Sequence, residues 1–190
     1  MSRIVNYAWT LFLVFSMIAS LVECQNVLSY PLPRLSIQPN SLSISGLSSG
    51  AYFAAQFQVA YSSSIVGSGI FAGGPFYCAQ GDFATANAAC MKVASMINLN
   101  TLQTSIVNFA SKGLIDGVEN VAKHRVYLFS GTKDYIVFPD IMKKLKEQLI
   151  NNFKVPESNV VADFGVAASH AMITNNYGAK CDTFGVSHCM

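Results

Sequence analysis

Gly46-Leu47-Ser48-Ser49-Gly50 is a G-x-S-x-G stretch that lies between two segments of different hydrophobic period. The alternating residues before it, which include Leu42 and Ile44, predict a β-strand, and the alanine-rich run from Ala51 to Tyr61 predicts an α-helix. A serine on a sharp strand-to-helix turn has strained backbone geometry, and glycines on either side let the strand and the helix approach closely. The stretch therefore predicts a nucleophile elbow in which Ser48 Oγ stands clear of the backbone.

The amide that follows the serine adds a second chemical group. Ser49 N–H opens the predicted helix and would point toward an oxyanion that develops during a reaction. The alternative is a tight Ser/Gly turn with no chemistry, because Gly and Ser are common and such a stretch also arises by chance. The strand before it and the helix after it favour the elbow, with Ser49 as an oxyanion-hole donor.

Strands and helices alternate along the rest of the chain. Apolar runs predict strands at 35–37, 65–72, 125–129 and 159–164. Helical patterns predict helices at 102–112 and from Asp140, as the capping residue, to Phe153. Strands separated by helices form parallel sheets, so the predicted fold class is α/β.

A serine nucleophile needs a histidine as base. Among the three histidines, only His170 follows the carboxyl end of a predicted strand, which is the sheet edge that carries the elbow. His124 precedes a strand and is predicted to be a solvated loop residue at the opposite edge. His188 adjoins Cys189 and is predicted to be structural. His170 is therefore the predicted base.

The base in turn needs a carboxylate that fixes its orientation. Asp134 lies just beyond the strand at 125–129, whereas Asp163 is inside a strand and Asp140 is the predicted helix cap. An ordinary turn aspartate is the alternative for Asp134. The order Ser48, Asp134, His170 is the Ser-acid-His order of α/β-hydrolases, so we predict these three residues as a catalytic triad.

Composition indicates one domain with a secretory leader. The chain has 190 residues, a formal net charge of +2 and only 12% charged residues, which argues against a nucleic-acid partner and a basic membrane-binding face. Residues 1–24 are predicted to be a signal peptide that is cleaved after Cys24 or after Ser20. An uncleaved membrane anchor is the alternative. We expect an extracellular domain at residues 25–190, without stable membrane association after cleavage.

Four cysteines remain if Cys24 leaves with the signal peptide, an even number that suits disulfides outside the cell. Three pairings are open to them. The local pairs Cys78 with Cys90 and Cys181 with Cys189 are favoured because each would hold a loop. The cysteines lack the C-x-x-C spacing of zinc sites, and we predict no metal and no cofactor.

Several parts of the chain resemble the secreted polyhydroxybutyrate depolymerases and related esterases, from about residue 35 to residue 185. The matching stretches are Gly46-Leu47-Ser48-Ser49-Gly50-Ala51-Tyr52, Ala72-Gly73-Gly74-Pro75-Phe76-Tyr77-Cys78-Ala79, Val126-Tyr127-Leu128-Phe129-Ser130-Gly131-Thr132-Lys133-Asp134 and His170-Ala171-Met172. Beside the histidine, Ser169 and Ile173 stand where Gly and Pro would be expected.

The resemblance implies the same three site residues, with Ser48 as nucleophile, Asp134 as acid and His170 as base. It also implies the reaction, which is a metal-free hydrolysis of poly(3-hydroxybutyrate) or related short-chain hydroxyalkanoate esters through an acyl-enzyme. The implied partner is therefore a polyester or small ester substrate. The oligomeric state is left open.

The resemblance further implies a circularly permuted α/β-hydrolase fold, in which strands that usually precede the elbow follow the histidine. Those strands, and the loop that gives a second oxyanion amide, have no counterpart before Ser48. We therefore expect a partial α/β-hydrolase domain whose carboxyl-terminal part is missing. Because one lost oxyanion donor costs about 10²- to 10³-fold in kcat, we expect little activity from the chain alone.

Two other functions remain open at this point. The triad does not name its acyl group, so an esterase acting on feruloyl or acetyl esters is one alternative. A non-catalytic secreted remnant that binds apolar polymers through aromatic residues such as Phe76 and Tyr77 is the other.

Overall fold

A computed structural model describes residues 33–183 and 185–190, so the predicted signal peptide at 1–24 lies outside the described residues. The chain divides into two units, Met1–Ile37 and Gln38–Met190. In the first unit, residues 33–37 form neither helix nor strand. The strand predicted at 35–37 is wrong, because Leu35 and Ile37 are 70% and 76% exposed and alternation without burial does not hold a strand.

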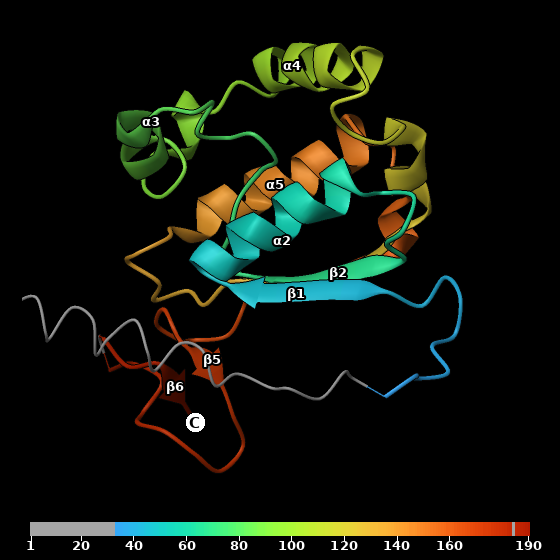
Figure 1. The fold of residues 1–190 in the computed structure, drawn as a ribbon. Coiled ribbons are helices and arrows are strands. Elements are labelled where there is room, and N and C mark those ends of the chain that lie inside the picture. Colours follow the sequence, from blue (N-terminus) through green and yellow to red (C-terminus); the bar gives the residue numbers. More distant parts are fainter. Residues whose placement is uncertain (1–32, 184) are drawn as a thin grey trace, which may run out of the picture. The chain divides into compact units, whose positions relative to one another are not determined.

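The second unit contains a parallel sheet of four strands in the order β1-β2-β3-β4 (Figure 1). The strands are β1 (Ser43–Leu47), β2 (Gly67–Phe71), β3 (Arg125–Phe129) and β4 (Val160–Asp163). Each strand pairs in parallel with its predecessor in the sequence. The α/β class predicted from alternating strands and helices is confirmed.

The principal helices lie on one face of this sheet (Figure 1). They are α2 (Ser49–Ala60), α4 (Leu99–Ser111) and α5 (Pro139–Asn151), and the shorter helices are α3 (Phe83–Ala88) and the 3₁₀ turns Ala94–Met96, Val118–Lys123 and Glu157–Asn159. Short crossovers between neighbouring parallel strands have one hand, which places successive helices on the same side. The core therefore lies between these helices and one sheet face, and it includes Ala54, Ile70, Ile106, Leu128 and Leu145.

The start of α5 differs from the prediction. Asp140 does not cap the helix: the capping position is Phe138, and Asp140 instead pairs with Lys143 at 2.8 Å. Pro139 occupies the first helical turn, where its fixed φ favours a helix and its missing N–H costs nothing.

The other sheet face is covered at the carboxyl end of β3 by the segment that follows β4. This segment contains the two-residue strands β5 (Met172–Ile173) and β6 (His188–Cys189), which pair in parallel. Phe129 packs there in a small apolar cluster with Ala168, Ala171 and Cys189. Over the described ranges, no helix is long and apolar enough to cross a membrane.

Candidate active site

The turn between β1 and α2 has the geometry of a nucleophile elbow. Ser48 connects the two elements with φ 59° and ψ −121°, a combination that non-glycine residues rarely adopt. Its N–H donates to Phe71 O at 3.0 Å, and its carbonyl accepts from Tyr52 N–H at 3.0 Å. The end of β2 and the first turn of α2 therefore hold the strained residue from both sides.

The two glycines of the stretch contribute unequally. A Cβ on Gly46 would lie 2.2 Å from the carbonyl carbon and oxygen of Gly50, so the close approach of strand and helix requires Gly46. A Cβ on Gly50 would meet no described atom within 4 Å. The steric reason predicted for two glycines holds for the first and is wrong for the second, because the second lies on the open side of the helix.

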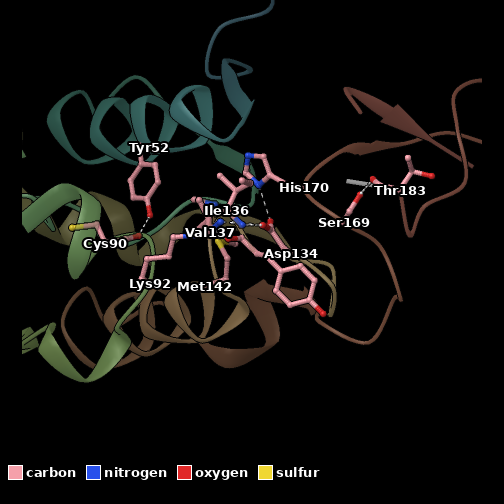
Figure 2. A network of polar contacts seen from close by, with 12 residues as sticks. Tyr52, Cys90, Lys92, Asp134, Ile136, Val137, Met142, Ser169, His170 and Thr183 are labelled. Carbon is pink, nitrogen blue, oxygen red and sulfur yellow. Dashed lines mark hydrogen bonds and ion pairs between the residues drawn. The ribbon is translucent and has the colours of Figure 1, made fainter. Parts of the chain in front are cut away.

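The predicted acid and base lie in direct contact. Asp134 follows β3 and is 2% exposed, and its Oδ2 lies 2.8 Å from His170 Nδ1 (Figure 2). Its other oxygen, Oδ1, accepts from the N–H groups of Ile136 and Val137 at 2.9 Å each. The carboxylate is thus held by its own loop, and it orients the imidazole so that Nε2 is left for another partner.

The loops that carry these two residues are bonded to each other. Thr132 N–H donates to Val166 O at 2.8 Å, and Lys133 N–H donates to Ala168 O at 3.0 Å. Gly131 makes the approach sterically feasible, because a Cβ there would lie 2.0 Å from Ala168 O. The contact between acid and base therefore rests on a close approach of two backbones.

Ser48 and His170 line the same cavity. Its volume is about 350 Å³, and its other lining residues are Leu47, Ile136, Gly185, Val186 and Ser187. Asp134 lies behind His170 rather than in the wall of the cavity. Ser49 is exposed at the first position of α2, where the helix leaves N–H groups free of intrahelical partners. Asp134 and His170 are thus in contact, and Ser48 shares a cavity with His170 at the carboxyl edge of the sheet.

The other two histidines lie elsewhere. His124 is at the amino edge of the sheet, as predicted, but it is 2% exposed, so the solvated loop environment predicted for it is wrong. Its Nε2 lies 3.0 Å from Ser62 O and its Nδ1 lies 3.2 Å from Gln58 Nε2. Burial lowers the pKa of His124. His188 is exposed beside Ser187 and Tyr177.

Sequence reasoning missed Tyr52 as a neighbour of the site. It lies four residues, about one helical turn, after Ser48, and its hydroxyl donates to Cys90 O (Figure 2). Burial, and then the negative charge of Asp134, raise the pKa of Tyr52, so the phenol stays protonated. The available signal was the spacing of four residues between Ser48, which precedes α2, and Tyr52 in its first turns.

The two aromatic residues considered for polymer binding differ in their exposure. Phe76 is 5% exposed and belongs to the main core. Tyr77 is partly buried and packs edge-on against Phe109 with ring centroids 4.8 Å apart. The polymer-binding role suggested for Phe76 is wrong, because its side chain is buried in the core. Tyr77 also lines a cavity of about 390 Å³, so the suggestion for Tyr77 stays a prediction.

Both favoured disulfides are present. Cys78 pairs with Cys90, and Cys181 pairs with Cys189. Within residues 33–183 and 185–190, we find no group of three or more His, Cys, Asp or Glu side chains that could hold a metal ion.

The sequence of the chain is similar to that of known enzymes. No family model matches the chain. It is 44% identical over 158 residues to a poly(3-hydroxybutyrate) depolymerase of Delftia acidovorans, a match that covers 83% of this chain and 32% of the relative. The chain is homologous to the polyhydroxybutyrate depolymerases. A polyhydroxybutyrate depolymerase of Talaromyces funiculosus is 37% identical over 157 residues, which cover 82% of this chain and 44% of that one.

Solved structures of polyhydroxybutyrate depolymerases have the same fold. One, which carries a serine-to-alanine substitution and is complexed with an R3HB trimer, gives a TM-score of 0.71 at 33% identity, covering 84% of this chain and 50% of that chain. The crystal structure of the enzyme from Penicillium funiculosum gives 0.70 at 32% identity, with coverage of 84% and 50%. They confirm the predicted α/β-hydrolase-like class. The chain thus spans about half the length of these structures, and 32% and 44% of the two curated relatives.

Proposed function

We propose that this chain is the catalytic part of a secreted serine esterase that hydrolyses ester bonds of poly(3-hydroxybutyrate) or related short-chain hydroxyalkanoate esters. The observation that carries the proposal is one cavity lined by both Ser48, on a positive-φ turn, and His170, whose Nδ1 lies 2.8 Å from Asp134. The homology to polyhydroxybutyrate depolymerases supports the substrate class.

In the proposed mechanism, Ser48 Oγ attacks the ester carbonyl carbon. His170 Nε2 takes the hydroxyl proton as the new C–O bond forms, and Asp134 stabilises the resulting imidazolium through Nδ1–H. The carbonyl oxygen becomes an oxyanion, toward which Ser49 N–H donates. Collapse of this intermediate breaks the ester C–O bond, and His170 returns its proton to the departing alkoxide.

Water then completes the cycle. The acyl group is held on Ser48 as an ester, and His170 Nε2 removes a proton from the attacking water. The second tetrahedral intermediate expels Ser48 Oγ, which regains its proton from His170. The products are a carboxylic acid and an alcohol, and no metal or cofactor takes part.

The size and lining of the cavity support the proposal that the substrate has a small aliphatic acyl group. Leu47, Ile136 and Val186 give it apolar walls, and its volume is about 350 Å³. Binding sites for small molecules are mostly apolar with a few placed polar groups, which Ser48 and His170 supply here. A 3-hydroxybutyrate unit, with one methyl branch, suits such walls.

Labelling with a fluorophosphonate tests the nucleophile directly. We expect stoichiometric labelling of the chain that is lost in Ser48→Ala and in His170→Ala. Asp134→Asn should slow labelling by about 10³- to 10⁴-fold, because an amide facing Nδ1 favours the wrong imidazole tautomer. Ser111→Ala, a substitution at an exposed serine on α4, is the matched control. A wild-type chain that is folded yet unlabelled would exclude the serine-hydrolase proposal.

Substrate class needs a second assay. The purified chain is offered emulsified poly(3-hydroxybutyrate), p-nitrophenyl butyrate, and feruloyl and acetyl esters. We expect slow release of hydroxybutyrate units and slow cleavage of the butyrate ester, both dependent on Ser48, because the rate should be lowered by the missing second oxyanion donor. Cleavage restricted to feruloyl or acetyl esters would keep the triad and overturn the proposed polyester substrate.

Secretion is part of the proposal and has its own support. Two disulfides suit an oxidising compartment rather than the cytosol. Expression of the chain in a eukaryotic host, followed by mass spectrometry of the medium, is expected to find a product that begins after Cys24 or after Ser20. Retention of the uncleaved chain in cell membranes would contradict the signal-peptide prediction.

A further inference from the structure

The residue before the proposed base is anchored by the carboxyl-terminal segment. Ser169 is 6% exposed, its N–H donates to Cys181 O at 2.7 Å, and its hydroxyl donates to Thr183 O at 2.9 Å (Figure 2). Its carbonyl accepts from Ala171 N–H at 2.9 Å, which closes a three-residue turn centred on His170. Ser169 thus uses its amide, hydroxyl and carbonyl groups to fix the backbone of its neighbour.

The other side of His170 is held by the same segment. Met172 N–H donates to Ser187 O at 3.0 Å, where β5 meets β6, and Thr174 N–H donates to Cys189 O at 2.7 Å. Residues 164–171 have no regular secondary structure of their own. The backbone position of His170, and with it the position of the imidazole, therefore depends on carbonyl groups within residues 181–189.

A disulfide fixes the distance between the two ends of this support. Cys181, whose carbonyl holds Ser169, is bonded to Cys189, whose carbonyl holds Thr174. Cys189 is fully buried beside Phe129 and Ala168, at the carboxyl end of β3. The same disulfide-closed loop includes Val186 and Ser187, which line the same cavity as Ser48 and His170.

We propose that Ser169 and the Cys181–Cys189 loop form a clamp that positions the His170 imidazole between Asp134 and Ser48. Ser169 is then a positioning residue, because it acts through the neighbouring histidine and does not line the cavity. This inference rests on the proposed function, since it takes His170 as the base. A general base must lie within hydrogen-bond reach of the proton it removes, and a displacement of about 1 Å can cost about 10²-fold in rate.

The clamp explains why a serine occupies this position. A residue without a hydroxyl could still offer its N–H to Cys181 O, but the bond to Thr183 O would be lost. The buried site leaves little room for water to replace that bond. Threonine keeps the hydroxyl and is the conservative replacement.

The first experiment compares Ser169→Ala, Ser169→Thr and Ser62→Ala with wild type. Ser62 is the matched control, because it is buried and its hydroxyl likewise donates to a backbone carbonyl, Gly117 O at 3.1 Å, outside the active-site cavity. With p-nitrophenyl butyrate, Ser169→Ala is expected to lower kcat by about 10-fold with little change in KM, because the base is displaced while the cavity walls remain. Ser169→Thr should restore kcat, and Ser62→Ala should leave it unchanged.

The second experiment removes the disulfide by replacing Cys181 and Cys189 together with serine. We expect kcat to fall by about 10- to 10²-fold while circular dichroism retains the signal of the main sheet and helices, whose core lies elsewhere. This variant also tests the clamp independently if Ser169→Ala does not fold. Wild-type kcat in both Ser169→Ala and the double cysteine variant would overturn the proposal.

A spectroscopic readout separates the clamp from the proposed function. The Nδ1–H proton of His170, which is bonded to Asp134, is identified in the proton NMR spectrum by its loss in Asp134→Asn. Loss or broadening of this resonance in Ser169→Ala, with retention in Ser62→Ala, supports the clamp even if no fluorophosphonate labels Ser48. An unchanged resonance in Ser169→Ala and the double cysteine variant overturns the clamp even if the chain is an active esterase.

Discussion

Ser48 lines the active-site cavity, and its backbone has an unfavourable conformation. Its φ of 59° with ψ of −121° belongs to a region that glycine enters freely and other residues enter at a cost of about 1–3 kcal/mol. Two hydrogen bonds hold it there: Ser48 N–H donates to Phe71 O, and Tyr52 N–H donates to Ser48 O. The serine is thus retained against the local conformational preference, which is expected where a side chain is needed for chemistry.

This strain predicts a separation of stability from activity. Ser48→Gly should raise the free energy of unfolding by about 1 kcal/mol relative to Ser48→Ala, because glycine relieves the backbone strain and alanine does not. Both variants should lose fluorophosphonate labelling. Urea unfolding followed by circular dichroism measures the difference, and equal unfolding free energies for the two variants would show that Ser48 is not strained.

His124 predicts a pH dependence that is unrelated to catalysis. Burial lowers its pKa from the ordinary value of 6.5 in the folded state. As pH falls below about 6.5, the unfolded chain therefore takes up the proton first, and the free energy of unfolding decreases toward the folded-state pKa. Above that range the histidine is neutral in both states and adds no pH dependence.

The measurement is urea unfolding between pH 7 and pH 5. Wild type is expected to lose stability over this interval, and His124→Gln should show a smaller loss because the titrating group is absent. His188→Gln, which changes an exposed histidine, is the control and should behave as wild type. A wild-type slope in His124→Gln would assign the pH dependence to other groups.

At the scale of elements, the site forms where loops at the carboxyl ends of neighbouring strands contact each other. The loop after β3 brings Asp134, and the segment after β4 brings His170. Gly131 is the point of closest approach between them, since a Cβ would lie 2.0 Å from Ala168 O. Ala168 O belongs to the backbone and a Cβ at position 131 would be fixed rigidly to it, so neither atom could move without displacing its loop.

Two Gly→Ala substitutions test this view of the loops. Gly131→Ala should separate acid and base and lower kcat on p-nitrophenyl butyrate by about 10²-fold or more, with a loss of thermal stability. Gly50→Ala is the matched control, because its Cβ meets no described atom and the residue lies in α2. It should leave kcat unchanged and stabilise the chain by up to about 1 kcal/mol. Equal kcat for the two variants would contradict the argument.

The elements that sequence predicted best are those with a strong period. The apolar run at 125–129 coincides with β3, and the elbow was predictable because a period of two changes to a helical period at Ser48. Strands β5 and β6 were not predictable, because two residues carry no period. The anchoring of Ser169 was also hidden, since its partners Cys181 and Thr183 are distant in sequence and offer carbonyl groups that any residue has.

At the scale of the molecule, the two sheet faces within residues 38–190 differ. One face carries the main core, whereas the other has a groove of about 680 Å³ over the amino halves of the strands. Ser45, Gly67 and Gly69 contribute small side chains or none to this groove, and Tyr127 and Val161 border it with 38% and 61% exposure. Parallel sheets are usually covered on both faces, so this groove is the region from which we expect self-association.

Replacement of an exposed valine by lysine tests that expectation. Val161→Lys on the edge strand β4 should lower concentration-dependent self-association, because a charge in the groove and on a sheet edge opposes docking. Val107→Lys is the control, since Val107 is 53% exposed on α4, outside the groove. Sedimentation velocity over a concentration series measures the effect. An equal decrease in both variants would point to net charge rather than the groove.

Because the strands are ordered in the sheet as in the sequence, the parts of the site are synthesised at different times. β1, α2 and β2 leave the ribosome first, and the pairing of β1 with β2 already supplies the Phe71 carbonyl that holds the nucleophile turn. The carbonyl groups that hold Ser169 and Met172 belong to residues 181, 183 and 187, which are translated more than a hundred residues later. A nascent chain therefore carries its proposed nucleophile long before its proposed base is aligned. Under the proposed function, esters inside the producing cell would meet an aligned base only after residues 181–189 have been synthesised and Cys181 and Cys189 have been oxidised.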